Sequence, residues 1–414
     1  MKIVFAPDSF KDSLSASRVS GILRKKAEEI FTKCTMQEIP LADGDKGTVD
    51  VLLSVLGGRR EWAMASNFMG EPIEVEYGVL PDGTVVAETG PLLCDDGRQE
   101  CSTRQKMLFS SSSGVGELIG TLLDRGYRKI YIGAGAGMTN DGGMGCAKAL
   151  GVRFLDQKGE ELGAAGFSLK EIRRIDTTGL DPRLSEAELT VMCAVNNVLV
   201  GDQGATYVYG AMNGGGPEEL IRLEHGMRNY AQSIEETTGL CVSECSGAGA
   251  AGGLPAALKA FGGAKLRSGI SSVLQLIHFE ELINDASLVV VGEGTLDRTS
   301  IYGKAISGIG MLCKAKKIPV VAVVGQMGQD AELLYHYGVS SMISSVNTIM
   351  EQEDAIENAE RLIGAAAERM FRLLAVGMEM QNCEAFFPDA GVELRVRADN
   401  QGRIHWAVDP EWDD

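Results

Sequence analysis

Acidic and basic side chains recur directly after short apolar runs that are typical of buried strands. The carboxyl ends of parallel strands meet at one edge of a sheet, and α/β proteins bind their ligands there, so these side chains could form one site for a small charged molecule. The alternative for the last of them is to cap a following helix. The residues are Asp8, Lys11, Asp43, Glu293 and Asp297.

A glycine-rich stretch, residues 133–143, offers a second kind of ligand site. It follows the strand-like run 129–132 and precedes an alanine-rich helix expected over 144–150. A glycine loop that leads into a helix N-terminus exposes unpaired backbone N–H groups, which can bind an anion. We therefore expect an anion site here, with Asp141 facing the ligand rather than acting only as a helix cap.

Three other patterns resemble known sites but lack their context. Residues 247–252 satisfy G-x-G-x-x-G, yet no clear strand precedes them and Arg267 stands where a ribose-binding acid would fall. Gly303-Lys304 is followed by Ala305 instead of the Ser or Thr of a P-loop. Cys241 and Cys245 could meet on one helix face, but no second cysteine or histidine pair lies nearby, so we expect no metal site there.

The order of elements predicts an α/β fold with two domains. Strand and helix patterns alternate at both ends of the chain, whereas the middle contains an antiparallel hairpin over 74–88 with its turn at Asp82-Gly83. The expected strands are 2–6, 37–41, 288–291 and 320–324, and the expected helices are 16–31, 48–56 and 353–374. We predict a parallel-sheet domain from residues 1–66 and 286–378, with an inserted mixed α/β domain over 67–285.

The last segment, 379–414, is expected to be a tail with a second hairpin. Residues 392–397 and 404–408 flank a turn, and Val392, Leu394 and Val396 alternate onto one face. Two isolated strands are marginal in water, so we expect the hairpin to dock on a sheet edge or on a second subunit. A homo-oligomer therefore remains open.

The composition excludes several classes of partner. The chain has 414 residues and a formal net charge of −18, which opposes binding to nucleic acid or to anionic membranes. No apolar run reaches the roughly 20 residues of a membrane span, and the N-terminal run is too short for a secretory signal. Nine scattered cysteines are more typical of reduced thiols than of a disulfide framework. We expect a cytoplasmic protein.

Taken together, these motifs resemble the type 1 glycerate kinases, in the family's order and over residues 1 to about 375. The matching stretches are 6–11, 13–16, 42–44, 47–50, 139–143, 247–254, 292–294, 296–297, 300 and 303–304. The resemblance implies a flavodoxin-like domain made from both chain ends and an inserted domain similar to restriction endonucleases. It also implies phosphoryl transfer from ATP, with Mg²⁺, to a hydroxyl of D-glycerate or a related small hydroxy acid, generally the 2-hydroxyl.

The same resemblance implies roles for individual residues. Asp8 and Lys11 would face the substrate or the phosphates. Asp43 and Asp297 would supply the other catalytic carboxylates. The residues expected to bind the nucleotide are Gly135, Gly137, Thr139, Asn140, Asp141 and Lys304. Those expected to bind the metal are Glu293 and Asp297.

The chain also departs from the family's usual motifs. The usual Asp-Gly-Gly-Glu-Gly-Thr has Asp45 and Lys46 at its third and fourth positions, and two usual aspartates and a usual lysine are replaced elsewhere. The replacements are Ala194, Asn196 and Asn213. A carboxylate site for Mg²⁺ would be weakened by these changes. The alternative function is therefore a diverged paralogue with weak or no kinase activity, which binds a small anion or a partner protein.

Overall fold

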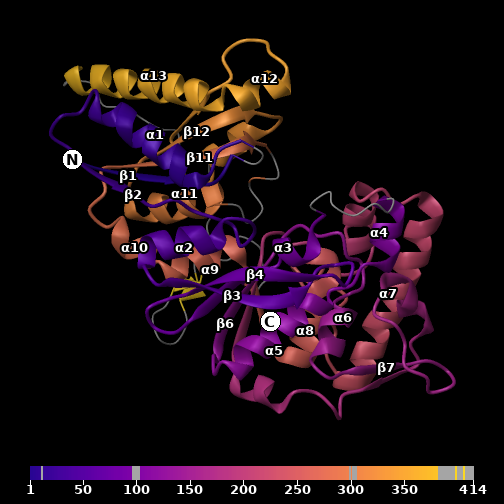
Figure 1. Ribbon diagram of the computed structural model, residues 1–414. Helices are drawn as coiled ribbons and strands as arrows, with labels where there is room; N and C mark the ends of the chain where they lie inside the picture. Colours follow the sequence, from indigo (N-terminus) through magenta and orange to yellow (C-terminus); the bar gives the residue numbers. More distant parts are fainter. Residues whose placement is uncertain are drawn as a thin grey trace. The chain divides into compact units, whose positions relative to one another are not determined.

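The chain forms two compact units in the computed structural model (Figure 1). The model describes residues 1–10, 13–95, 103–297, 300 and 305–380, and the backbone of 397–398 and 404–405. Unit 1 comprises Met1–Asp43 and Val273–Asp414, and unit 2 comprises Gly44–Ser272. The expected boundaries near residues 66 and 286 differ from these, because the segment 44–66 belongs with the inserted part.

Unit 1 is built on a parallel sheet of five strands in the order β13-β12-β11-β1-β2. Counted along the chain within this sheet, the order is 2-1-3-4-5, which is that of doubly wound flavodoxin-like sheets. The strands are β1 (Lys2–Pro7), β2 (Thr35–Glu38), β11 (Leu288–Leu296), β12 (Val320–Met327) and β13 (Ser341–Ser344). The strand order reverses between β1 and β11, so the switch point lies at their carboxyl ends.

Helices cover both faces of this sheet. α1 (Ala16–Glu28) and α13 (Ala359–Glu379) pack together on one face, where Phe371 makes edge-to-face contacts with Phe5 and Phe31. α11 (Ala305–Lys316) lies on the opposite face, as Figure 1 shows. The remaining helices are α10 (Phe279–Leu282), η6 (Ala331–Tyr335) and α12 (Gln352–Glu357), while α9 (Gly269–Leu276) spans the boundary between the units. The helix expected over 353–374 is thus interrupted at Asn358, which separates α12 from α13.

Unit 2 contains a mixed sheet of six strands in the order β10-β9-β6-β5-β4-β3. The expected hairpin is present, because β4 and β5 pair antiparallel around the turn that contains Gly83. β3 pairs along its whole length with β4, which places it in unit 2. The strands are β3 (Arg59–Ser66), β4 (Pro72–Val79), β5 (Val85–Glu88), β6 (Lys129–Ala134), β9 (Glu188–Cys193) and β10 (Lys265–Ser268). β5, β6, β9 and β10 run parallel, so their carboxyl ends share one edge.

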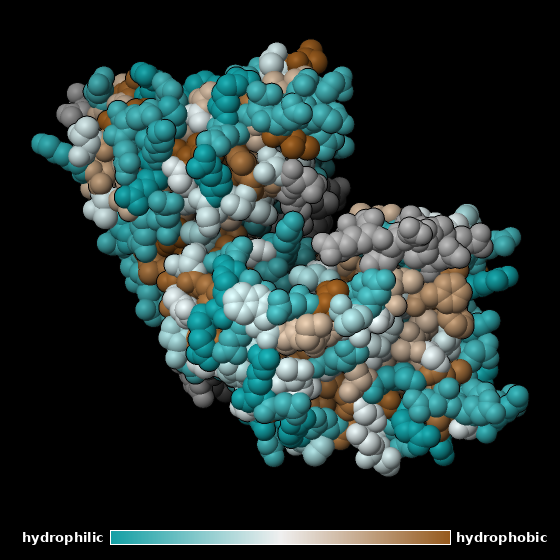
Figure 2. Space-filling model, viewed as in Figure 1, coloured by the Kyte–Doolittle hydropathy of each residue, from teal (hydrophilic) through white to brown (hydrophobic). Residues whose placement is uncertain are grey.

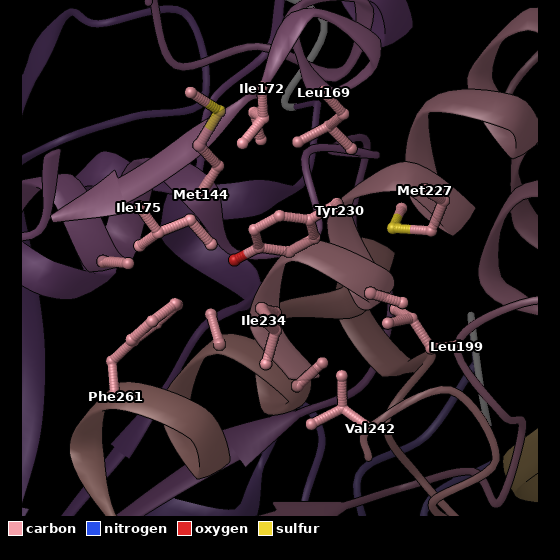
Figure 3. Close-up of a cluster of buried hydrophobic side chains, with 14 of the residues drawn as sticks. Met144, Leu169, Ile172, Ile175, Leu199, Met227, Tyr230, Ile234, Val242 and Phe261 are labelled. Atoms are coloured by element: carbon pink, nitrogen blue, oxygen red, sulfur yellow. The ribbon is translucent and has the colours of Figure 1, made fainter. Parts of the chain in front are cut away.

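A buried cluster between helices holds the other half of unit 2 together (Figure 3). Tyr230 and Ile234 of α7 (Pro217–Thr238) pack there with Met144 of α6 (Met144–Ala149) and Phe261 of α8 (Leu254–Gly262). The other elements are α2 (Thr48–Leu56), α3 (Gly90–Leu93), α4 (Thr103–Phe109), α5 (Ser113–Asp124), η1 (Gly166–Glu171), η2 (Pro182–Glu186), η3 (Thr206–Gly210) and η4 (Ala250–Gly253), with the small sheet of β7 (Arg153–Leu155) and β8 (Arg174–Asp176).

The described part of the tail is a short hairpin. β14 (Arg397–Ala398) and β15 (Ile404–His405) pair antiparallel, in agreement with the hairpin expected from the sequence. Val392, Leu394 and Val396, whose alternation suggested docking, lie outside the described residues. The docking of the tail therefore stays a prediction.

The visible surface is mainly hydrophilic, as the high charge requires (Figure 2). Among the described residues, no helix combines the length and the apolar character needed to span a bilayer.

Candidate functional site

Asp8 lies at the switch point of the unit 1 sheet. β1 ends at Pro7, which is in register with Gly292 of β11, and the N–H of Asp8 donates to the carbonyl oxygen of Gly292 at 2.9 Å. The Asp8 Oδ1 atom accepts the N–H of Ser9 at 2.6 Å, which fixes the half-buried carboxylate at the end of the strand. Asp8 therefore occupies the position where α/β sheets of this order bind ligands.

Asp43 comes after β2, and Glu293 lies within β11, the strand on the other side of β1. The N–H of Leu41 donates to the carbonyl oxygen of Pro7 at 2.9 Å, so the chain after β2 continues alongside β1 almost to Asp43. Glu293 immediately follows Gly292 within β11, and its Oε2 atom is buried. Three neighbouring chain segments thus deliver a carboxylate toward the same edge, as the sequence predicted from their spacing.

Asp297 directly follows the end of β11 and begins a turn. Its N–H donates to Ser300 Oγ at 3.3 Å, and the N–H of Ser300 donates to its carbonyl oxygen at 3.0 Å. Asp297 lies four residue steps of extended chain after Glu293, which places their Cα atoms about 13 Å apart. A single ion held directly by both carboxylates is therefore not favoured by this backbone. Lys11 and Lys304 lie outside the described residues.

In unit 2, the loop that follows β6 is fixed through its carbonyl oxygens. Residues 135–138 each accept one hydrogen bond: Gly135 from Ala251 N–H (3.0 Å), Ala136 from Cys94 Sγ (3.5 Å), Gly137 from Asn213 Nδ2 (2.9 Å) and Met138 from Ser110 Oγ (3.2 Å). In contrast, the N–H groups of Gly135, Ala136 and Gly137 donate to no other residue that the structure describes. Consecutive N–H groups of this kind can bind an anion.

Asp141 is a buried helix cap, in contrast to the expectation that it faces a ligand. Its side chain is fully buried, and its oxygens accept hydrogen bonds from the N–H and Oγ of Ser112, both at 2.8 Å. They also accept the N–H groups of Gly143 (3.1 Å) and Gly145 (3.0 Å) at the start of α6. Burial raises the pKa of this carboxyl, and the four hydrogen bonds act in the opposite direction.

Thr139 and Asn140 are also buried and bind other parts of unit 2. Thr139 Oγ1 donates to the carbonyl oxygen of Ala251 at 3.2 Å, and the Asn140 side chain lies 3.3 Å from Thr206 Oγ1. The close approach of residue 252 also explains its glycine, since a Cβ there would lie 1.8 Å from the Thr139 carbonyl oxygen. These side chains therefore position the loop, and its exposed part is the backbone around Ala136.

Sequence reasoning missed the segment that crosses the carboxyl edge of the unit 2 sheet. A Cβ on Gly133 would lie 2.3 Å from the carbonyl oxygen of Gly44, and a Cβ on Gly135 would lie 2.2 Å from Cγ of Asp45. Asp45 therefore lies directly against the loop after β6. The Asp45 charge also contributes to raising the pKa of Cys94 to about 11, which burial mainly causes, while Lys46 acts in the opposite direction.

Glu88 binds the backbone just after Asp45, at the start of α2. It ends β5, and its Oε1 atom accepts the N–H of Val49 at 2.8 Å at the start of α2. Burial raises the pKa of Glu88, while the N–H groups of Val49 and Gly47 lower it. No sequence pattern singles out Glu88, because a glutamate at the end of a hairpin strand is ordinary.

The positions that depart from the family's usual motifs gather around the same loop. Asn213 donates to Gly137, Asp45 lies against Gly135, and Ala194 donates its N–H to the carbonyl oxygen of Ala134 at 3.0 Å. The departures are therefore concentrated in unit 2, while the carboxylates at the edge of the unit 1 sheet are all retained.

Comparison with known proteins decides the family. The model of the glycerate kinase family matches residues 3–375. The chain belongs to the glycerate kinase family. It is 37% identical to the glycerate kinase of Halalkalibacterium halodurans, over 89% of this chain and 97% of that protein. It is also 37% identical to the glycerate 2-kinase of Escherichia coli K12, over 91% and 99% of the two chains.

The fold of this glycerate kinase family member is also similar to that of a solved structure. The crystal structure of a candidate glycerate kinase 2 from Salmonella typhimurium LT2 is 36% identical and superposes with a TM-score of 0.77. It covers 92% of this chain and 99% of its own. The family model ends at residue 375, shortly before the end of α13, so the tail lies outside the matched residues.

Proposed function

We propose that this chain is an ATP-dependent kinase that phosphorylates D-glycerate at the 2-hydroxyl group. The observation that carries the proposal is the match, over nearly the whole of each relative, to proteins named glycerate kinase and glycerate 2-kinase. The retained carboxylates at the switch point of unit 1 support it, because phosphoryl transfer needs a group that orients or deprotonates the attacking hydroxyl.

The alternative, a diverged paralogue without efficient kinase activity, is not favoured. It depends on the charge changes around the loop after β6, where Asn213 and Asp45 make contacts within unit 2. Identity of 37% over almost the full length of named kinases weighs against a loss of function.

Asp8 is our candidate for the group that orients the substrate hydroxyl. Its carboxylate is fixed by the Ser9 N–H and lies at the switch point, with Asp43 following the neighbouring segment. Lys11 and Lys304 would supply the positive charges that the phosphates require, since both occupy the family's motifs. Their placement is an expectation from the sequence alone.

The donor set at the edge of unit 1 fits Mg²⁺. This ion is usually bound through one or two carboxylates, together with water and substrate phosphates. The described residues hold no group of three or more potential ligands, so the ion would take its remaining ligands from water and from the phosphates. Asp297 or Glu293 would hold the ion. When bound, Mg²⁺ neutralises charge on the phosphates.

We assign nucleotide binding to the backbone of the loop after β6. The N–H groups of Gly135, Ala136 and Gly137 would donate to phosphate oxygens. Thr139, Asn140 and Asp141 would act indirectly by holding the loop in place.

Product analysis tests the proposal directly. The purified chain is incubated with ATP, Mg²⁺ and D-glycerate, and the phosphorylated product is identified by ³¹P and ¹H NMR. We expect 2-phosphoglycerate. Formation of 3-phosphoglycerate would contradict the assignment of the hydroxyl, and ATP consumption that is independent of the acceptor would contradict the kinase assignment.

A further inference from the structure

Two cysteines that the proposed reaction does not use lie close together after α7. Cys241 is exposed and Cys245 is half-buried, and the Cys245 Sγ atom lies 3.2 Å from the carbonyl oxygen of Cys241. Standard backbone dimensions then place this sulfur within about 6 Å of the Cys241 Cα atom. Rotation of the exposed Cys241 side chain can bring its sulfur toward that of Cys245, and a disulfide forms when the two sulfurs approach to about 2.05 Å.

A lysine lies against the sulfur of Cys245. Lys259 of α8 donates from Nζ to Cys245 Sγ at 3.3 Å. Within the described part of the chain, the half-buried Lys259 ammonium forms its hydrogen bond with this sulfur. No carboxylate of the described residues lies within 4.0 Å of the ammonium nitrogen. A neighbouring ammonium attracts the negative charge of a thiolate, which is the nucleophilic form of cysteine.

Among the residues that the structure describes, no other cysteine sulfur accepts a hydrogen bond from a lysine. Burial raises the pKa of four of them and so favours the unreactive thiol: Cys94, Cys146, Cys193 and Cys313. Cys34 is half-buried like Cys245 but has no lysine bonded to its sulfur among the described residues. It is therefore an internal reference for an ordinary accessible thiol.

We propose that Cys245 reacts with hydrogen peroxide and then forms a disulfide with Cys241. The Cys245 thiolate attacks one peroxide oxygen, so that an S–O bond forms, the O–O bond breaks, and hydroxide leaves and is protonated to water. The sulfur loses two electrons, and the peroxide gains them. Cys241 sulfur then attacks the sulfenic sulfur, the S–S bond forms, and the hydroxyl leaves as water with the Cys241 proton.

The disulfide would act on the segment that follows β9. The N–H of Leu199 donates to the carbonyl oxygen of Ser243, between the two cysteines, at 3.1 Å. Just after them, Ser246 Oγ donates to the carbonyl oxygen of Asn196 at 3.3 Å, and Gly249 N–H donates to that of Asn197 at 2.9 Å. A disulfide between Cys241 and Cys245 would therefore strain the hydrogen bonds that join this segment to residues 196–199.

Peptide mapping of the whole chain tests the modification without reference to kinase activity. The reduced protein is treated with one equivalent of hydrogen peroxide, alkylated, digested and analysed by mass spectrometry. We expect a peptide linking Cys241 to Cys245, lighter by two hydrogens and restored by dithiothreitol, while Cys34 remains alkylated. Earlier oxidation of Cys34 or Cys94, or a link from Cys245 to Cys383, would overturn the proposal.

Variants separate the role of Lys259 from a merely structural one. Lys259→Met is expected to slow oxidation of Cys245 severalfold, because it removes the ammonium group that lies 3.3 Å from the sulfur, and Lys259→Arg is expected to restore it. Lys265→Met, at an exposed lysine paired with Glu188, is the matched control. Cys241→Ser is expected to leave a sulfenic acid on Cys245 that dimedone traps. If Lys259→Met proves unstable, the ratio of Cys245 to Cys34 oxidation in the wild-type chain decides, and a ratio near one refutes the proposal.

Amide exchange tests the mechanical link. We expect oxidation to increase hydrogen exchange at the N–H groups of Leu199 and Gly249, which donate to the carbonyl oxygens of Ser243 and Asn197 beside the new ring. Unchanged protection in a fully oxidised sample would overturn this part of the proposal.

Discussion

The role of each carboxylate follows from what its oxygens already bind. Asp141 is fully buried and accepts four hydrogen bonds within unit 2, so its charge serves the start of α6. Asp8 is half-buried, its Oδ1 atom accepts the N–H of Ser9, and it directly follows β1 at the switch point. The sequence placed both residues in motifs, but only the burial of each side chain distinguishes a cap from a residue that can face a substrate.

Replacing Asp8 tests this distinction. Asp8→Asn keeps the size of the side chain and an acceptor for Ser9, but removes the charge that would orient or deprotonate the hydroxyl. We expect kcat to fall by about 10²–10⁴, the usual contribution of a general base, with little change in melting temperature. Asp285→Asn, at an exposed aspartate paired with Lys2, is the control and should retain activity. Equal activity of both variants would exclude a catalytic role for Asp8.

Glu88 gives a prediction for the pH dependence of stability. Because burial raises its pKa above that of the unfolded chain, about 4.3, its stabilising contribution is greatest below that value and is lost as the pH rises through the folded pKa. Glu88→Gln removes this titration and keeps an acceptor for Val49. We expect urea unfolding to show the wild type losing free energy of unfolding relative to Glu88→Gln between pH 4 and pH 8. A difference that is constant or that grows in favour of the wild type would contradict this.

At the scale of elements, the loop after β6 depends on a close contact that no single motif reveals. A Cβ on Gly135 would meet the Asp45 carboxylate at 2.2 Å. The segment that carries Asp45 is held in turn by Glu88 at the start of α2. Residue 135 thus packs against the side chain of a residue 90 positions earlier.

Gly135→Ala should therefore displace the Asp45 side chain and destabilise the protein by about 1 kcal/mol, the lower end of the usual cost of overpacking, because the end of this side chain can move. Asp45→Gly removes the opposing carboxylate and should recover most of the loss in the double variant. Gly120→Ala, on the open side of α5, is the matched control and should be neutral or slightly stabilising. Chemical denaturation measures all four proteins. An additive double variant would show that the contact with Asp45 is not the cause.

The sequence predicts which segments form strands better than it predicts which strands and loops lie next to one another. The buried run at β1, the hairpin of β4 and β5, and the strands β11 and β12 follow from apolar patterns and turn residues. The boundary near residue 66 could not be predicted, because the pairing of β3 with β4 depends on contacts rather than on composition. The same reason explains why Asp45 and Glu88 were missed, whereas Asp8 was found from its place after a strand.

At the scale of the whole molecule, the chain consists of a family fold and an additional tail. The family match ends at residue 375, close to the end of α13, and the described tail is a short hairpin. Exposed apolar side chains, Leu373, Val376, Met378 and Met380, lie at the end of α13, where the tail begins.

Deleting residues 381–414 tests the role of the tail. Because an isolated two-stranded hairpin is marginal in water, we expect the deletion to lower the melting temperature or to reduce the oligomeric mass measured by light scattering. The turnover of the kinase should be retained, since the family match ends at residue 375, before the deleted segment begins. If both melting temperature and mass remain unchanged, the tail does not dock.

The central claim is that the family scaffold in this chain still transfers phosphoryl groups to glycerate. The most direct measurement is steady-state ATP turnover by the purified, folded protein with D-glycerate and Mg²⁺, with acceptor-free and Asp8→Asn reactions as controls. We predict acceptor-dependent formation of 2-phosphoglycerate, with kcat in the ordinary kinase range of about 1–100 s⁻¹. Turnover no greater than in the acceptor-free reaction, by protein whose thermal unfolding is cooperative, would contradict the account.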